Sequence, residues 1–162
     1  MHVTRQIDKY SKQNRMLKSA LANVKISQVT WQKSEKLLRM VRTPVFIEEQ
    51  FVTPDFEWDE IDASATHLLA KHKNQAIACL RMIDYQKIGR MAVLKDWRGI
   101  GLGMALLLEA IKICHSHGSN TIYLSAQTHA IEFYRKAGFV VMTEEYCDVD
   151  IPHVDMQLDA SN

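Results

Sequence analysis

The sequence predicts a single mixed α/β domain of the α+β kind, in which one strand–helix–strand crossover joins otherwise local strand pairs. The chain has 162 residues, 47% of them hydrophobic and 24% charged, which is enough to bury one sizeable core. Short runs with strand alternation are interleaved with runs of helical periodicity. Strands at 87–93 and 121–127 flank a helix at 102–117, so these two strands are expected to be parallel neighbours.

The first part of the chain is expected to alternate between helix and strand. Residues 1–24 carry apolar side chains alternately three and four apart, which predicts a basic amphipathic helix packed on this domain or on a second subunit. Residues 24–29 then alternate as a strand does. Thr30 stands where it can cap a following amphipathic helix, and Pro44 ends or redirects that helix.

The rest of the chain is expected to supply most of the sheet. The acidic and aromatic segment 48–62 is predicted to be largely loop, and two apolar runs within 65–83 predict a hairpin. The helix of the crossover is expected to stop at Gly118, and a short helix after the second crossover strand is expected to stop at Gly138. The tail is expected to form two strands around a loop at Pro152.

Charge and cysteine content exclude several classes of protein. A net charge of +1 argues against a general nucleic-acid-binding protein, which carries a basic excess. No apolar run has the length of a membrane span and no signal-peptide pattern begins the chain, so a cytoplasmic protein without a membrane partner is expected. Cys79, Cys114 and Cys147 are dispersed and odd in number, which predicts free, mostly buried thiols. Cys114 and His117 lie three apart without a second ligand pair, so no metal is expected.

Acidic side chains crowd two segments of the chain. Seven carboxylates and no Lys or Arg lie in the first segment, where Phe51, Phe56 and Trp58 are interleaved with Glu48, Glu49, Asp55, Glu57, Asp59, Glu60 and Asp62. The second segment holds Glu144, Glu145, Asp148 and Asp150. Such carboxylates and aromatic rings favour a cationic ligand. The alternative is that the carboxylates form a solvated surface and the aromatic residues belong to the core.

Three glycines, Gly99, Gly101 and Gly103, stand between a predicted strand and a predicted helix. The dinucleotide fingerprint needs a glycine where Met104 stands, and the P-loop needs a lysine that is absent here, so neither motif fits. Unpaired amides at a helix start, glycines that let an anion approach the backbone, and the charge of Arg98 predict a pyrophosphate site. The alternative is an ordinary strand-to-helix turn.

The stretch MAVLKDWRGIGLG resembles the acetyl-CoA signature of the GNAT superfamily of N-acetyltransferases, with a strand, the pattern R-x-x-G-x-G and a helix. Downstream, IYLSAQTHAIEFYRKAGF resembles the next strand and helix of that superfamily. VFIEEQFV, EWDEIDASATH, IGRMAV and VDIPHVDM are similar to a group of small bacterial members of mostly unassigned substrate. The resemblance covers about 24–158 and implies a GNAT domain at 24–162 after a helical extension at 1–23. It implies a mixed, mostly antiparallel sheet with a splayed parallel strand pair, flanked by helices.

The resemblance also implies where acetyl-CoA, the expected co-substrate, binds. Its pantetheine arm is expected to pair with the main chain of Met91, Ala92 and Val93, as an added strand does. Its pyrophosphate is expected on the turn and helix start, which comprise Arg98, Gly99, Ile100, Gly101, Leu102, Gly103 and Met104. Ala130 and Phe133, from the second motif, are expected to complete the cofactor site.

Tyr134 matches the family's general-acid position, and its hydroxyl is suited to protonate the departing thiolate. A proton acceptor is also needed, because a free alkylamine has a pKa near ~10.4 and is mostly protonated at neutral pH. Glu49 is the first candidate for this base. Glu48, His67 and His153 are the others, and a bound water relay is an equal alternative.

The expected function is the acetyl-CoA-dependent transfer of an acetyl group to a primary amine, a small cationic one, by direct attack in a ternary complex. One alternative is a non-catalytic acyl-CoA-binding or sensing module. Another is an acetyltransferase that acts on a protein or on the amine of an aminoacyl-tRNA, although the acidic segments argue against an RNA partner. A homodimer formed through the amino-terminal helix is left open.

Overall fold

A mixed eight-stranded sheet forms the centre of the molecule, with the strand order β1-β2-β3-β4-β5-β8-β6 and with β7 paired to β8. The structure, a computed structural model, describes residues 19–160. Every strand pair is antiparallel except β4 with β5, which is parallel. The strands are β1 (Val24–Val29), β2 (Thr66–His72), β3 (Gln75–Ile83), β4 (Lys87–Val93), β5 (Thr121–Gln127), β6 (Val140–Val141), β7 (Tyr146–Asp148) and β8 (Ile151–Asp159). The predicted mixed α/β class is confirmed.

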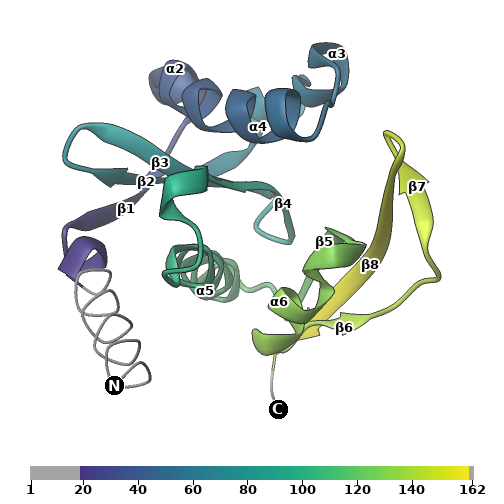
Figure 1. The fold of residues 1–162 in the computed structure, drawn as a ribbon. Coiled ribbons are helices and arrows are strands. Elements are labelled where there is room, and N and C mark those ends of the chain that lie inside the picture. The colour runs from purple at the N-terminus through teal and green to yellow at the C-terminus, as the bar shows by residue number, and fades with distance from the viewer. Residues whose placement is uncertain (1–18, 161–162) are drawn as a thin grey trace, which may run out of the picture.

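Helices cover both faces of the first half of this sheet. Figure 1 shows α2 and α4 on one side of the strands β1–β4 and α5 on the other. Leu38 and Val41 of α2 pack on Leu69 and Cys79, whereas α5 belongs to a larger core with the other face of the sheet. The helices are α2 (Trp31–Arg42), η1 (Thr43–Glu49), α3 (Pro54–Glu57), α4 (Ile61–Ser64), η2 (Lys95–Trp97), α5 (Leu102–Ser116), η3 (Thr128–Ala130) and α6 (Ile131–Lys136).

The start of the chain agrees with the sequence where it is described. Residues 19–22 are helical, and the rest of the predicted amino-terminal helix lies outside the described residues. Thr30 occupies the N-cap position of α2, but its side chain makes no capping hydrogen bond. Pro44 redirects the helix rather than ending it, because the chain continues as the wider π-helix η1. Pro44 has no backbone N–H to donate, and it stands in the first turn of η1.

Two predictions of local structure are wrong. The segment 48–62 is not largely loop, because it contains the end of η1, all of α3 and the start of α4. Pro54 in the first turn favours α3, as do the carboxylates near its N-terminus. The tail contains three strands, and Pro152 lies inside β8 rather than in a loop. The turn is instead at Val149 and Asp150, which have φ of +49° and +60°.

The other predicted elements are confirmed. The hairpin is β2–β3, and the crossover strands are the parallel pair β4 and β5 around α5. Gly118 and Gly138 follow α5 and α6 with φ of +85° and +98°, a conformation that glycine adopts without strain. Within residues 19–160, no helix combines the length and the apolar character that crossing a membrane requires.

The thiols are mostly buried, as predicted. Cys79 and Cys114 are buried, whereas Cys147 is exposed. Burial raises the pKa of the Cys79 thiol to about 12 and that of the Cys114 thiol to about 11. These two thiols therefore hold their protons at neutral pH and are not nucleophiles.

Candidate active site

The parallel strands β4 and β5 meet at only two positions, Lys87 with Tyr123 and Ile88 with Leu124. Beyond Ile88 the two strands diverge, so the edge of β4 from residue 89 to Val93 has no strand partner on the β5 side among the described residues. An unpaired edge offers backbone N–H and C=O groups to an extended chain. Met91, Ala92 and Val93, the residues predicted to bind the pantetheine arm, form this edge.

A β-bulge at Arg90 produces the divergence. The register between β3 and β4 shifts between Cys79 and Arg81, and Arg90 has φ of +47°. The Arg90 guanidinium donates hydrogen bonds to the carbonyl oxygens of Phe56 and Glu57 at 3.1 and 3.2 Å, which fixes this unusual backbone to the α3 segment. A bulge bends its strand, so β4 turns away from β5 at this point.

The glycine turn leaves space and unpaired amides at the start of α5. Gly99 and Gly101 have φ of +75° and +89°, and a Cβ on Gly101 would meet only Leu21, at 4.0 Å. No side chain caps α5, and the N–H of Ala105 donates to the carbonyl of Gly101 at 3.0 Å. The N–H groups of the three preceding helical residues therefore carry the positive pole of the helix. These features fit a pyrophosphate.

Three of the predicted cofactor residues converge from different elements. A Cβ on Gly103 of α5 would lie 3.4 Å from Met91 Cε of β4 and 3.5 Å from Phe133 Cζ of α6. These are ordinary van der Waals distances, so the Met91 and Phe133 side chains both lie against the first turn of α5. Ala130 ends η3, directly before α6 begins. The residues predicted to bind acetyl-CoA from β4, from the glycine turn and from α6 thus lie close together.

Tyr134 lies beside this cluster. Its ring packs edge-on against Phe133 and Phe139, with centroid distances of 5.1 and 6.1 Å. Burial raises the pKa of Tyr134 to about 12. The hydroxyl therefore keeps its proton throughout the neutral range and can donate it.

Glu49 and Arg98 form an ion pair next to the glycine turn. The Arg98 Nη1 and Nη2 atoms donate to the two carboxylate oxygens of Glu49 at 2.8 and 2.9 Å, and Arg98 Nε donates to the carbonyl of Val93 at 2.8 Å. The hydrogen bonds from Arg98 lower the pKa of Glu49. Both oxygens of this candidate base are thus engaged with a cation, which weakens Glu49 as a proton acceptor.

The face of β5 that points away from α5 carries a set of polar side chains, which we call the polar face. Gln127 and Ser125 of β5 are paired with His153 and Asp155 of β8, and their side chains point away from the α5 core that buries the intervening Ala126. At the end of β5, Gln127 Nε2 donates to Gln50 Oε1 at 2.7 Å, so this face adjoins the end of η1.

Tyr146 of β7 extends this polar set. Its hydroxyl donates to Asp155 Oδ1 at 2.5 Å, so the hydrogen bond with Ser125 must be donated by the serine. Burial and the hydrogen bond to Asp155 raise the pKa of Tyr146. The ring of Tyr146 also stacks on His153, with a centroid distance of 6.1 Å.

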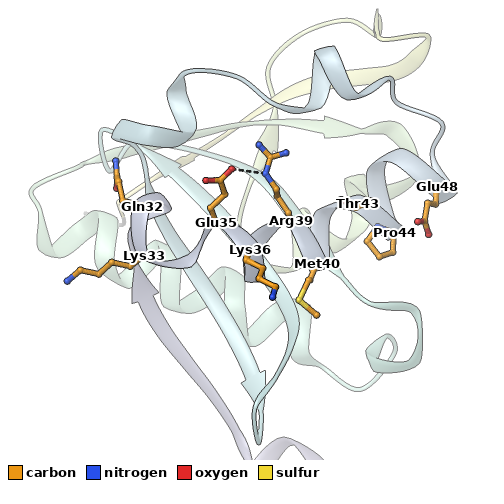
Figure 2. Close-up of a pocket in the computed structure, with 9 residues that line it drawn as sticks. All are labelled: Gln32, Lys33, Glu35, Lys36, Arg39, Met40, Thr43, Pro44 and Glu48. Carbon is orange, nitrogen blue, oxygen red and sulfur yellow. Dashed lines mark hydrogen bonds and ion pairs between the residues drawn. The ribbon is translucent and has the colours of Figure 1, made fainter.

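Two other candidate bases lie away from this face. His67 is buried, its Nε2 lies 2.9 Å from the carbonyl of Asp62, and burial lowers its pKa, so it is a structural residue. Glu48 of η1 lines a hollow along α2, whose lining residues Figure 2 shows. The described residues that line this hollow come from α2 and η1, and none of them belongs to the glycine turn: Gln32, Lys33, Glu35, Lys36, Arg39, Met40, Thr43, Pro44 and Glu48.

Four of the seven carboxylates in the first acidic segment form ion pairs with arginines: Glu49, Glu57, Asp59 and Asp62. Glu57 and Asp62 are buried and pair with Arg42 at 2.6 and 2.7 Å, and Asp62 also pairs with Arg81 at 2.9 Å. Trp58 stacks on Arg42, with the guanidinium carbon 4.8 Å from the ring centroid. These carboxylates are therefore counterions of the protein's own arginines. They no longer support the inference of a cationic ligand.

The sequence reasoning did not single out Gln50, Arg90, Ser125, Gln127 and Tyr146. A signal for two of them was present, because β5 alternates apolar with polar residues, although its neighbours place it in the centre of the sheet. A polar face on a central strand indicates a site rather than a core. The bulge at Arg90 has no such signal in the sequence.

An unpaired strand edge that leads through a glycine turn to a helix start, with a partly buried tyrosine beside it, is the arrangement expected of an acyl-CoA-dependent acyltransferase. The comparisons agree, since the family model described as an acetyltransferase (GNAT) domain matches residues 32–160. The chain belongs to the GNAT acetyltransferase family, as the sequence predicts.

Known relatives resemble the chain over most of its length. YjcF of Bacillus subtilis (strain 168), named an uncharacterized N-acetyltransferase, is 34% identical over 134 residues, which are 78% of this chain and 96% of that protein. The crystal structure of an acyl-CoA N-acyltransferase from Pseudomonas aeruginosa is 32% identical, with a TM-score of 0.74 over 83% of this chain and 99% of that one. Escherichia coli ElaA is 27% identical, with a TM-score of 0.76 over 84% and 99% of the two chains.

Proposed function

We propose that the protein transfers the acetyl group of acetyl-CoA to a primary amine. The observation that carries this proposal is the edge of β4 from Met91 to Val93, which is unpaired on the β5 side and continues into the glycine turn before α5. A strand edge and an electropositive turn in this order match a ligand with an extended amide-containing arm and a pyrophosphate.

In the proposed cofactor site, the main chain of Met91, Ala92 and Val93 binds the pantetheine arm. The backbone N–H groups from residue 98 to 104 bind the pyrophosphate, and Phe133 and Ala130 pack beside the arm. Acetyl-CoA supplies an activated acetyl thioester when bound. Arg98 adds a positive charge to the turn, and this charge is balanced by Glu49 in the free protein.

Tyr134 is proposed as the general acid, which gives its Oη proton to the departing sulfur. The burial that raises its pKa to about 12 supports this role, because the phenol is protonated at every pH at which the enzyme is expected to work. The tyrosine lies in α6, next to Phe133, so the same short helix contributes to the cofactor site and to the chemistry.

The acceptor is proposed to be a small cationic amine that approaches the polar face of β5, β7 and β8. Four exposed carboxylates border this face on the hairpin region, and within residues 19–160 none of them has an ion-pair partner: Glu144, Glu145, Asp148 and Asp150. Their field attracts cations. The cytoplasm, expected from the sequence, remains the proposed location.

An acceptor screen tests the proposal. The protein is incubated with acetyl-CoA and a panel of polyamines, aminoglycosides, lysine and arginine derivatives, with neutral and acidic amines of similar size as controls. Thiol release gives the rate, and mass spectrometry of the product identifies the acetylated nitrogen. Turnover of cationic amines above the neutral controls supports the proposal. Binding of acetyl-CoA without turnover on any amine would favour a non-catalytic acyl-CoA-binding module instead.

A further inference from the structure

His153 of β8 is held in one orientation and one tautomer. Its Nδ1 atom lies 2.7 Å from the carbonyl oxygen of Ile151, and a carbonyl oxygen can only accept a hydrogen bond. Nδ1 must therefore carry the proton of the neutral imidazole. The other ring nitrogen, Nε2, then has a lone pair and is able to accept a proton.

The position of His153 places this nitrogen on the polar face. His153 is paired with Gln127 of β5 on one side and with Tyr146 of β7 on the other. Its ring is half-buried and is inclined by 21° to that of Tyr146. Side chains on a central strand between two partners are held more firmly than those on a loop, so Nε2 is presented in a fixed place.

The polar face lies at the open end of the strand pair. The divergence of β4 and β5 begins beyond Leu124, and Gln127 ends β5 immediately before η3 and α6, which carries Tyr134. Tyr134 packs with the α5 core, whereas Gln127 and His153 point to the other side of the sheet. A proton donor and a proton acceptor thus flank the end of β5 from opposite faces.

We infer that His153 is the proton acceptor of the transfer, a role that rests on the proposed function and deepens it. The ammonium form of the acceptor first loses one proton to solvent. As the amine nitrogen forms its bond to the acetyl carbon, it gives a second proton to His153 Nε2. The carbon–sulfur bond breaks, and the sulfur takes the Tyr134 Oη proton. Solvent then returns a proton to Tyr134 and removes one from His153, so protons and charge balance.

Two carboxylates lie on the same face of the sheet as His153. Asp155 follows it on the same face of β8, and Asp148 of β7 lies on that face opposite Ile151. Tyr146 contributes a neutral phenol. From β5, Ser125 and Gln127 are uncharged, and Glu49 at the end of η1 is paired with Arg98.

Replacing His153 by asparagine separates the proposed role from a structural one. The amide nitrogen of Asn occupies the place of Nδ1 and keeps a donor for the Ile151 carbonyl, while Nε2 is lost. We expect His153→Asn to reduce kcat/KM for the amine by roughly 10²- to 10⁴-fold, with the acetyl-CoA Kd from calorimetry unchanged. The fall in rate of the wild-type enzyme at acidic pH should disappear in the variant, since no imidazole remains to be protonated.

His115→Asn is the matched control. Its Nδ1 also lies 2.9 Å from a backbone carbonyl, that of Ser119, but at the far end of α5. This variant should keep the wild-type rate and pH profile, and thermal unfolding followed by circular dichroism checks that both variants are folded. A His153→Gln variant serves as the second test if His153→Asn does not fold.

The outcomes are separable. Turnover by the wild type that is matched by folded His153→Asn, at every pH, would overturn the inference and leave the proposed function standing. Absence of turnover by the wild type on every amine would overturn both. A readout independent of turnover is the ¹⁵N spectrum of histidine-labelled protein, in which His153 should show a protonated Nδ1 and an unprotonated Nε2. The opposite tautomer would also overturn the inference.

Discussion

Arg98 and Glu49 form a two-point ion pair, with Nη1–Oε2 and Nη2–Oε1 distances of 2.8 and 2.9 Å, that joins the glycine turn to the end of η1. The next residue of the chain, Gln50, accepts a hydrogen bond from Gln127 at the end of β5. The end of η1 therefore connects to both strands of the diverging pair. It reaches β4 through Arg98, which also donates to the Val93 carbonyl, and β5 through Gln127. A change in this short segment can affect both substrates.

Glu49→Gln should strengthen the binding of acetyl-CoA. The substitution removes a carboxylate beside the turn while it keeps the size of the side chain, so the positive charge of Arg98 is no longer neutralised. Because the pair is exposed and screened by water, the effect should be modest, about two- to fivefold in Kd, and should shrink as salt is added. Calorimetric titration at two salt concentrations measures it.

The same variant distinguishes this role from that of a general base. Loss of a base would lower kcat roughly 10²-fold or more and would remove the acidic limb of the pH profile. Retention of kcat with tighter cofactor binding agrees with the observed pairing to Arg98. A large fall in kcat with an unchanged Kd would restore Glu49 as the proton acceptor and would argue against His153.

Gly101→Val should abolish acetyl-CoA binding. A β-branched residue at φ of +89° is strained, and its side chain would fill the space over the first amides of α5. Gly118→Val is the control, because Gly118 has φ of +85° at the other end of the same helix with nothing within 4 Å of a Cβ. Both variants should lose similar stability in urea unfolding, and only Gly101→Val should lose the cofactor. Equal Kd values for the two would remove the turn from the binding site.

Tyr134→Phe should reduce kcat by roughly 10²- to 10⁴-fold and leave the acetyl-CoA Kd within about twofold of the wild type. The ring contacts with Phe133 and Phe139 need no hydroxyl, so the fold should be retained. Stopped-flow thiol release gives the rate. Because the pKa of Tyr134 is raised to about 12, the wild-type enzyme should show no loss of rate from this residue between pH 7 and pH 10. Undiminished turnover of the variant would make Tyr134 a packing residue only.

The donor half of the site could be predicted because its function depends on local sequence. Arg98 and the three glycines all lie within residues 98–103, and a turn before a helix needs no distant partner to take its shape. The acceptor half could not be predicted in the same way. Gln50 and Gln127 are 77 residues apart, and their contact depends on how η1 is directed after Pro44. The identity of the two glutamines alone does not predict that they are in contact.

The acidic segment shows why charge in the sequence misled. Glu57, Asp59 and Asp62 have no basic neighbour in sequence, and their partners Arg42, Arg81 and Arg90 come from α2, β3 and β4. Ion pairs between distant elements are invisible to a local count of charges. The side chains of Phe51 and Phe56 are 85% and 64% exposed, so these two aromatic residues do not belong to the core.

The ion cluster around Arg42 should dominate the stability of this end of the molecule. Arg42 is only 1% exposed and donates to Glu57 Oε1, to Asp62 Oδ1 and to the Glu57 carbonyl. Arg42→Met has a similar size but leaves two buried carboxylates without their main counterion. Such a loss costs roughly 3–5 kcal/mol, which urea unfolding at pH 8 should show. Arg39→Met, which breaks the exposed pair with Glu35 and a contact with Trp58, should cost no more than about 1 kcal/mol.

The cost of Arg42→Met should depend on pH in a defined direction. Burial raises the pKa of Asp62, but the hydrogen bonds and charges of Arg42 and Arg81 outweigh it and lower the pKa overall. A lowered carboxyl pKa contributes stability above the unfolded value of ~3.9, and this contribution is lost as the pH falls. Without Arg42, Asp62 and Glu57 can relieve their unpaired charge by taking up protons. The difference in unfolding free energy between wild type and variant should therefore be smaller at pH 4.5 than at pH 8. A difference that stays constant over this range would show that the loss comes from packing and not from charge.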